Sequence, residues 1–413
     1  MKCGMRLPLL VLVFVLLSSG LKSGHAADDP AAAAARASLE RIQGLRKERP
    51  GDGLLVFYEA VTRVALGEHK AALDLLQSLK GRKLGLIPVR DVGFDAIWDN
   101  AEFQKIRKEL AAEEAETPAA PVAFRLKDPR LVPEGIAYSP AGDCFFIGSV
   151  AQHKIVLVDN KGEAREFSKA ADKLDAVLGL AVDTERGHLY AVTTNAFEES
   201  GKTERRNSVV RYHLKTERLL DRFDAADALQ LNDLTIAPDG TLYATDSMGG
   251  TLFRKKADET TLTVLGEKAE LRGANGIALG KDGALYVTLS TGIARVETES
   301  GRATRLPQPD TVATGGIDGL YWSEGDLIGI QNTTNPGRVI RVALADHGSR
   351  IAGLTVLQSH HHPEFDEPTT GAIANGKLHV IGNSYVGHYQ PDGTINNAGT
   401  LKGTAIIAVP LKR

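Results

Sequence analysis

The pattern of hydrophobic positions divides the chain into two regions with different periods. In the first region, apolar residues such as Leu54, Tyr58 and Val61 recur at three- and four-residue steps, the spacing of one face of an α-helix. In the second, short apolar runs alternate with polar residues and end in Gly or Asp-Gly turns, which predicts β-strands. We therefore expect a helical region (31–115), a Pro/Ala-rich linker (116–121) and an all-β region (122–413).

The all-β region contains six segments that repeat one pattern. A leading residue is followed by an apolar strand, a turn rich in Gly and Asp, and a second apolar strand. Successive leading residues are 43 to 54 residues apart, a period typical of the four-stranded blades of a β-propeller. The leading residues are Glu134, Leu178, Asn232, Asn275, Asp318 and Thr370.

The two ends of the all-β region complement each other. The last unit has only three evident strands, of which the final one runs from Thr404 to Val409. The segment from Val122 to Leu126 can supply the missing strand, and this pairing would close a ring and remove an exposed sheet edge. We therefore expect an all-β fold, a six-bladed β-propeller. The alternative, an open solenoid, would need polar end caps, and nothing in the sequence resembles them.

The helical region, here called the helical arm (residues 31–115), includes one helix–turn–helix unit. Small residues at Ala60 and Ala72, Gly67 in the turn and Leu76 resemble a single tetratricopeptide repeat. A further helix is expected over 100–114. Because one repeat cannot bury its apolar face alone, we expect the arm to pack on itself or on the propeller. It would serve either as a structural cap, which we favour, or as a surface for a protein partner.

The leading residues suggest a metal site. The first strand of each blade lines the channel of a propeller, so equivalent positions lie at one height around it. Glu134, Asn232, Asn275 and Asp318 would place two carboxylates and two amides there. This donor set favours one divalent cation, Ca²⁺, with Mg²⁺ and Mn²⁺ as alternatives and Zn²⁺ less suited without His or Cys. Each residue alone could be a turn residue, but carboxylates gathered at one position would repel without a cation.

The same segments carry a resemblance to a known family. The all-β region resembles the senescence marker protein/regucalcin/gluconolactonase family and, more distantly, paraoxonases and diisopropyl fluorophosphatase. The resemblance implies a six-bladed, metal-dependent hydrolase of lactones or related esters. The segments that carry it are Pro133-Glu134-Gly135, Asn232-Asp233-Leu234, Pro238-Asp239-Gly240, Tyr243-Ala244-Thr245-Asp246-Ser247, Ala274-Asn275-Gly276-Ile277 and Ile317-Asp318-Gly319.

The resemblance also implies roles for individual residues. Glu134, Asn275 and Asp318 match metal ligands, and Asn232 matches either the fourth ligand or a contact to substrate or water on the metal. The metal would polarise the carbonyl as a Lewis acid and position water. We expect Asp318 to be the catalytic residue, as general base or nucleophile, because it is the carboxylate on the metal opposite Glu134.

Further substrate contacts are expected from the loops on the same face of the disc. Beside Asn232 these are Gln230, Thr370 and His362; Gln230 stands where sugar lactonases of this family carry arginine. The long connections 194–207 and 383–400 would form a wall and a lid. The loop 360–367 has three interpretations: a second metal site, a solvated loop, or the carrier of a histidine proton shuttle.

Composition and the first residues narrow the setting. The 49 basic and 52 acidic residues leave no basic footprint for nucleic acid. Lys2 and Arg6, an apolar run to Leu17 and the small-x-small pattern ending at Ala26 predict a signal peptide (1–26), too short to span a membrane. We expect a periplasmic or secreted protein that acts on a small-molecule lactone or ester.

Two other functions compete with the hydrolase. One is a non-enzymatic propeller that binds a ligand or a protein and holds a structural Ca²⁺. The other is a metal-independent propeller resembling strictosidine synthase, which the complete set of candidate ligands disfavours. Metal-dependent turnover on a panel of lactones and esters separates these possibilities, because fold alone does not determine function.

Overall fold

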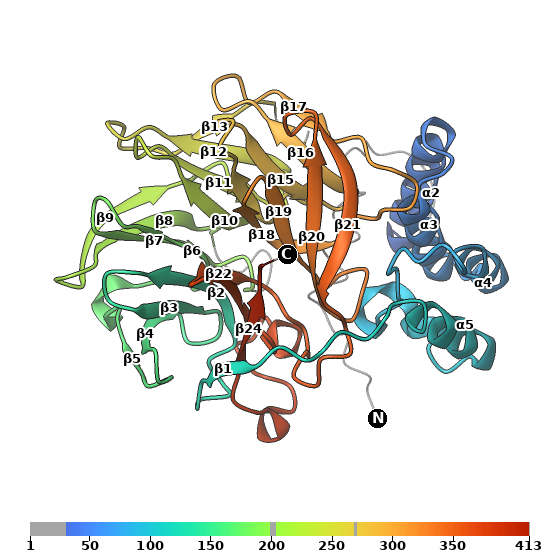
Figure 1. Cartoon of the computed structure of the whole chain (residues 1–413), viewed down its shortest axis with the longest axis horizontal. Coiled ribbons are helices and arrows are strands. Elements are labelled where there is room, and N and C mark those ends of the chain that lie inside the picture. The colour runs from blue at the N-terminus through green and yellow to red at the C-terminus, as the bar shows by residue number, and fades with distance from the viewer. Residues whose placement is uncertain (1–29, 199–203, 268–270, 413) are drawn as a thin grey trace.

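The computed structural model describes residues 30–198, 204–267 and 271–412. Its β-region consists of six four-stranded antiparallel sheets around a common axis (Figure 1). The expected six-bladed β-propeller preceded by helices is therefore confirmed. The expected signal peptide (1–26) lies outside the described residues.

Each of the first five blades follows the chain order from its innermost to its outermost strand. First strands of successive blades contact one another around the channel, as β2, β6, β10, β14 and β18 do. The first two blades are β2 (Pro133–Ser139), β3 (Cys144–Ser149), β4 (Lys154–Asp159) and β5 (Ala164–Glu166), then β6 (Ala176–Asp183), β7 (His188–Thr194), β8 (Asn207–His213) and β9 (Arg218–Asp224).

The next three blades keep this order. They are β10 (Leu231–Ile236), β11 (Leu242–Asp246), β12 (Thr251–Lys255) and β13 (Thr263–Leu265), then β14 (Ile277–Leu279), β15 (Leu285–Leu289), β16 (Gly292–Val296) and β17 (Ala303–Arg305), then β18 (Ile317–Ser323), β19 (Asp326–Gln331), β20 (Arg338–Ala345) and β21 (Arg350–Gln358).

The sixth blade joins the two ends of the propeller. It contains β22 (Gly371–Ala374), β23 (Lys377–Ile381), β24 (Ala405–Pro410) and, outermost, β1 (Val122–Arg125). Strand β1 pairs with β24 in an antiparallel register that places Phe124 opposite Ile406. The ring is thus closed by the strand that the sequence suggested, and the closure protects an edge that would otherwise be open.

The propeller core lies between neighbouring blades. Between the first two blades, Phe146 of β3 stacks edge-on against Phe167 with ring centroids 4.8 Å apart, and Phe167 contacts Tyr212 of β8 at 5.4 Å. All three side chains are buried. Such packing between sheets, rather than within one, holds each blade at a defined angle around the channel.

Two helices of the helical arm begin at side-chain caps. The Asp52 side chain caps one helix by accepting a hydrogen bond from Leu54, and Asn100 caps another by accepting from Phe103, as expected for N-cap residues. The expected helix over 100–114 ends earlier, at Ala111. The elements are α2 (Pro30–Glu48), α3 (Gly53–Ala65), α4 (His69–Ser78), η1 (Arg90–Phe94), η2 (Asp95–Ile97) and α5 (Ala101–Ala111).

The arm packs both on itself and on the propeller. Its own core gathers Phe57, Phe94 and Phe103, whose neighbouring ring centroids are 5.5 Å apart. In Figure 1 the helices lie beside the blade that ends in β21. Within the described residues, no helix is both long and apolar enough to cross a membrane.

The arm docks on one particular face of the disc. Tyr58 donates to the carbonyl of Ser290 (2.9 Å), which follows β15, and Asn335 between β19 and β20 donates to Gly85 (2.9 Å). Connections between second and third strands lie at the end of the blade where the first strand starts. The arm therefore covers part of the face that carries the leading residues.

Candidate metal centre in the propeller channel

Four of the leading residues start β-bulges in the first strands. In β2, Glu134 and Gly135 together oppose a single residue of β3, because Pro133 pairs with Ser149 and Ile136 with Ile147. The same irregularity occurs at the leading positions of β6, β10 and β18. A bulge redirects a side chain out of the regular alternation of a strand, so the repeat carries its own device for aiming the leading residue.

The leading positions of adjacent blades touch one another around the channel. Thr370 donates its hydroxyl to the carbonyl of Glu134, which joins the sixth blade to the first. A side chain at Gly135 would place its Cβ 1.9 Å from the carbonyl oxygen of Leu178. Glycine is needed there because only a residue without Cβ lets the backbones approach this closely. The leading residues thus form a tight ring, here called the channel ring: Glu134, Leu178, Asn232, Asn275, Asp318 and Thr370.

The two carboxylates of the channel ring are buried, and no positively charged side chain of the described residues forms an ion pair with them. Glu134 is 7% exposed and Asp318 is 8% exposed. Burial first, and then neighbouring carboxylates, raise the pKa of Glu134 well above its usual range; those neighbours are Asp318, Asp233 and Glu367. Burial raises the pKa of Asp318 to about 6, although the neighbouring amides of Asn332 and Asn275 lower it. The charges of the two acids therefore interact across the channel.

The amide residues of the channel ring are held by their neighbours. Asn232 donates its amide nitrogen to the Ser247 hydroxyl (2.9 Å), so its oxygen is the atom left to act as a ligand. Ser247 in turn donates to the carbonyl of Ala274. Asn275 is half-buried and interacts with Asp318. The structure thus brings Asn275 and Asp318 together with Glu134, and places Asn232 beside them in the ring.

These residues fit a hard divalent cation. Glu134 Oε2 and Asp318 Oδ1 are buried and have no hydrogen-bond partner among the described residues. A buried carboxylate oxygen without a donor is costly unless a cation neutralises it. No group of three or more His, Cys, Asp or Glu residues that could hold a metal occurs in the described part of the chain, so the amide oxygens would have to complete the ligand set, as Ca²⁺ accepts.

A third acid, Asp233, lies just beyond the channel ring. Its carboxylate accepts from the backbone N–H of Leu234 (2.8 Å) and of Ile277 (3.4 Å), which links the third and fourth blades. Burial raises its pKa to about 7, against the effect of these hydrogen bonds. Asp233 replaces the glycine that follows the leading residue in the other blades.

A cavity of about 260 Å³ extends along the channel past Asp233. Its lining combines Asp233, Thr235 and Tyr321 with apolar side chains such as Ile277 and Leu320. The Tyr321 hydroxyl accepts from the backbone of Gly371 (2.6 Å). A small, mostly uncharged molecule or a column of water would suit this space.

The remaining expected substrate contacts have different outcomes. Thr370 belongs to the channel ring and lines the cavity. Gln230 is half-buried, and its backbone N–H donates to Asp246 (2.9 Å) while its carbonyl accepts from Ser247 (3.0 Å). It lies two residues before Asn232 in the chain, and among the described residues no hydrogen bond joins its side chain to the channel ring.

The structure does not bring His362 to the ring, which corrects the expected substrate contact. The ring of His362 is 4% exposed. Its Nε2 bonds to the carbonyl of Ala120 in the linker (2.9 Å), and its Nδ1 accepts from Glu364 (3.2 Å). Both ring nitrogens are therefore used in local packing. His360 is also engaged, by Glu114 of the arm, so the loop 360–367 is not simply solvated.

The connections 194–207 and 383–400, expected as wall and lid, contact each other through their described residues, while 199–203 lie outside the described residues. Phe197, in the connection after β7, contacts Tyr389, in the connection after β23, with ring centroids 6.4 Å apart. Glu367 accepts from the backbone of Gly387 with both oxygens at 3.0 Å. These contacts join three connections, and Phe197 and Tyr389 pack in the same apolar cluster as Leu178 of the channel ring.

Two residues that orient the channel ring were not expected from the sequence. Asn332 donates to Asp318 Oδ2 (2.7 Å) and to the carbonyl of Pro368 (2.8 Å), and Ser247 holds Asn232. Both directly follow the second strand of their blade. A polar residue at that repeat position was therefore the signal that could have revealed them.

The chain matches no protein-family model and no curated protein. Among solved structures it is similar to a gluconolactonase from Xanthomonas campestris, at 15% identity over 72% of this chain and 99% of that one, with a TM-score of 0.48. It is also similar to an aldose sugar dehydrogenase from Streptomyces coelicolor, at 16% identity over 70% of this chain and 97% of that one, with a TM-score of 0.47.

A third similar structure is the virginiamycin B lyase from Staphylococcus aureus, at 19% identity over 64% of this chain and 81% of that one, with a TM-score of 0.45. The three proteins carry names for different reactions. None of these similarities assigns an activity to this chain, whose chemistry has to be derived from its own residues.

Proposed function

We propose that this protein is a metal-dependent hydrolase of a lactone or a related ester. The observation that carries the proposal is the pair of buried carboxylates, Glu134 and Asp318, each with one oxygen that has no donor among the described residues. The proposal also draws on the resemblance of the ring segments to lactone-hydrolysing propellers. A channel ring made only for packing would not retain two uncompensated acids.

Four residues would hold the ion: Glu134, Asn232, Asn275 and Asp318. When bound, a divalent cation polarises a carbonyl oxygen and stabilises negative charge that develops on it. The protein contributes the arrangement of its own donors. Ser247 fixes the amide of Asn232, so this ligand needs little reorganisation when the site is loaded.

Asp318 is the residue we assign to proton transfer or nucleophilic attack. Asn332 occupies one carboxylate oxygen, Oδ2, so Oδ1 would have to contact the ion and also face the reacting group or water. Burial raises the pKa of Asp318 to about 6, whereas contact with the cation would lower its basicity, so a role as base requires Asp318 to use only one oxygen on the ion. Thr370 and the cavity beyond Asp233 would limit the size of the group accommodated in the channel.

A binding propeller with a structural Ca²⁺ is the second candidate. The low exposure of the channel ring favours it, because Glu134, Asn232 and Asp318 are each only 7 to 8% exposed. A hydrolase would need the loops around Tyr389 to open for a substrate, whereas a structural ion needs no access. The two candidates therefore differ in turnover and not in metal binding.

The deciding experiment measures hydrolysis of γ-lactones, δ-lactones and aryl esters by the purified protein. Activity should fall at least about 100-fold after chelation and return with added Ca²⁺, because the cation carries the electrophilic role. Mg²⁺ and Mn²⁺ serve as parallel additions. Turnover that persists without divalent ions would contradict the proposal, and Ca²⁺ binding without turnover on any substrate would favour the binding propeller.

A further inference from the structure

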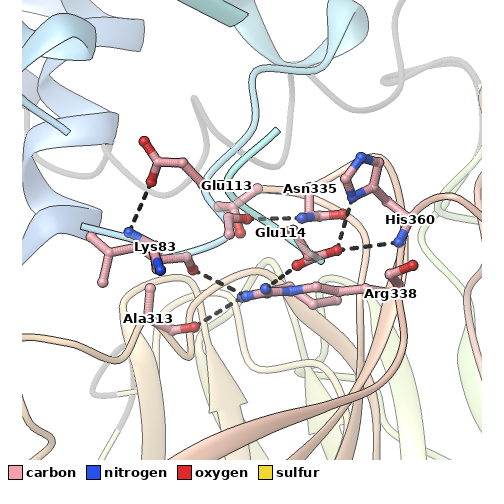
Figure 2. A network of polar contacts seen from close by, with 12 residues as sticks. Lys83, Glu113, Glu114, Ala313, Asn335, Arg338 and His360 are labelled. Carbon is pink, nitrogen blue, oxygen red and sulfur yellow. Dashed lines mark hydrogen bonds and ion pairs between the residues drawn. The ribbon is translucent and has the colours of Figure 1, made fainter. Parts of the chain in front are cut away.

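Glu114, just after the last helix of the arm, reaches into the propeller. Its carboxylate forms an ion pair with Arg338 and accepts from the ring and backbone of His360 at 2.8 and 3.2 Å (Figure 2). The side chains of Glu114 and Arg338 are only 4% and 3% exposed. We call Glu114, Arg338 and His360 the arm clasp.

Arg338 also hydrogen-bonds to the neighbouring strand, β19. It starts β20, and its Nε donates to Gln331 Oε1 (2.8 Å) at the end of β19. The amide nitrogen of Gln331 donates to the carbonyls of Ala313 and Gly315, in the connection that leads to Asp318. Gln331 is fully buried, so its amide is fixed on one side by Arg338 and on the other by this connection.

The residue after Gln331 is Asn332, which holds Asp318. Asn332 donates to Asp318 Oδ2 at 2.7 Å. A rotation or shift at the end of β19 would therefore move the donor that orients the carboxylate. Hydrogen bonds join Arg338 to Glu114 and to Gln331, and the backbone joins Gln331 to Asn332, which completes a path from the arm to the channel ring.

We propose that the helical arm is a working part of the candidate site, with Glu114, Arg338 and Gln331 as positioning residues for Asp318. This inference rests on the proposed function, since it assigns the arm to the same metal-binding carboxylate. Positioning residues matter because a ligand displaced by a fraction of an ångström loses much of its affinity or reactivity. A propeller without the docked arm would keep the four ligands but not the orientation of Asp318.

The arm also closes the path sterically. Arg338 donates to the carbonyl of Leu84 (3.1 Å), and Leu54 of α3 lies where a side chain on Gly315 would stand, 2.3 Å from the Cβ position. Arm residues therefore contact both segments that Gln331 connects. If the arm undocked, Arg338, which donates to Gln331, and the segment with the acceptor carbonyls of Ala313 and Gly315 would both lose their contacts with the arm.

The same blade offers a matched control. Arg341, also on β20, forms a buried ion pair with Asp326 at 3.2 Å, and both side chains are 7% exposed. Asp326 starts β19, at the end of the blade opposite to Asn332. Breaking this pair should disturb stability as breaking the arm clasp does, but it lies off the path to Asp318.

The test measures Ca²⁺ binding by calorimetry on full-length protein, with five variants compared at matched folded fraction. We expect Glu114→Gln and Gln331→Leu to weaken Ca²⁺ binding about 10-fold, Asn332→Ala to weaken it at least as much, and Asp326→Asn to leave it within twofold of the unchanged protein. The double variant Glu114→Gln/Arg338→Met leaves no unpaired buried charge. It should recover thermal stability and keep the binding defect.

The outcomes separate the two proposals. Wild-type affinity in folded Glu114→Gln and Gln331→Leu overturns the role of the arm and leaves the proposed hydrolase intact. An equal loss of affinity in Asp326→Asn also overturns it, because general destabilisation would then explain the result. Absence of Ca²⁺ binding in the unchanged protein overturns the metal centre and, with it, this inference.

Discussion

The buried carboxylates of this protein form two groups with opposite surroundings. In the channel ring, Glu134 and Asp318 face each other and each keeps one oxygen without a donor among the described residues. In the arm clasp, Glu114 is shared between Arg338 and His360. The pKa of Asp318 is raised by burial to about 6. Burial would likewise raise the pKa of Glu114, but its partners outweigh burial and lower it to about 2.

This contrast distinguishes a candidate metal site, the channel ring, from a structural contact, the arm clasp. A buried acid with a paired cation is already compensated, so it can fasten two parts of a chain together. A buried acid without one is costly in the empty protein and gains from any cation that arrives. Similar burial of the same chemical group therefore has different consequences, and each group can be altered separately.

The largest expected effect comes from neutralising Asp318, one of the two acids of the channel ring. Asp318→Asn should lower kcat on a lactone or ester about 100- to 10,000-fold, the range that a general base contributes. The metal-free protein should lose little stability, because the substitution removes one of two repelling acids. Steady-state kinetics and thermal unfolding with chelator measure the two effects.

The matched variant Asp326→Asn checks this prediction. It also neutralises a buried aspartate, but one that pairs with Arg341. It should destabilise the protein and leave kcat of the folded fraction nearly unchanged. If Asp318→Asn retained full turnover with the ion bound, Asp318 would not be the catalytic residue.

The next largest effect is a loss of stability when the arm clasp is broken. Glu114→Gln should lower the free energy of unfolding by about 3 to 5 kcal/mol, the usual cost of removing one partner of a buried ion pair. Urea unfolding followed by fluorescence measures it; Trp98 lies in the arm and Trp322 in the propeller. An early arm transition would show that the clasp stabilises docking rather than the propeller itself.

The exposed pair between Lys70 and Asp74 on α4 is the control for this variant. Both side chains are largely in solvent, so Asp74→Asn should leave the unfolding curve nearly unchanged. Equal destabilisation by the two substitutions would mean that burial of Glu114 has no special consequence, contrary to the contrast drawn above.

The smallest expected effect is a loss of folding stability at acidic pH. The folded pKa of Glu114, about 2, lies below its ordinary value of 4.5, so the unfolded chain binds the proton first as pH falls. The stability due to Glu114 is therefore complete above about pH 4.5 and is lost as pH falls toward 2. Arg338 stays charged over this range, and His360 remains the second partner.

Unfolding free energies of wild type and Glu114→Gln, measured from pH 6 to pH 3, isolate this effect. Both proteins retain the channel-ring acids, and the difference between the curves removes the part of their titration that the arm clasp does not alter. The gap between the two curves should narrow as the pH falls. A constant gap would show that protonation of Glu114 does not weaken the arm clasp.

Much of the fold was predictable because it repeats. Leading residues such as Glu134 and Asp318 recur at one period, and a closed ring of blades must bring equivalent positions to one axis. The strand beginning at Val122 was likewise predictable from a blade with one strand missing. Asn332 and Ser247 escaped prediction because they belong to a position after the second strand, where polar residues usually need no explanation.

The sequence by itself determined the six blades, their closure and the identity of the acids and amides that share a ring, since periodicity converts directly into symmetry. Only the tertiary structure decided where the arm lies and what its last residues touch. Arg338 and Glu114 are 224 positions apart, and His360 and Glu114 are 246 apart. No local pattern relates residues at such distances. His362 turned to the linker and His360 to the arm because docking of separate segments, and not spacing along the chain, determines which buried groups become partners.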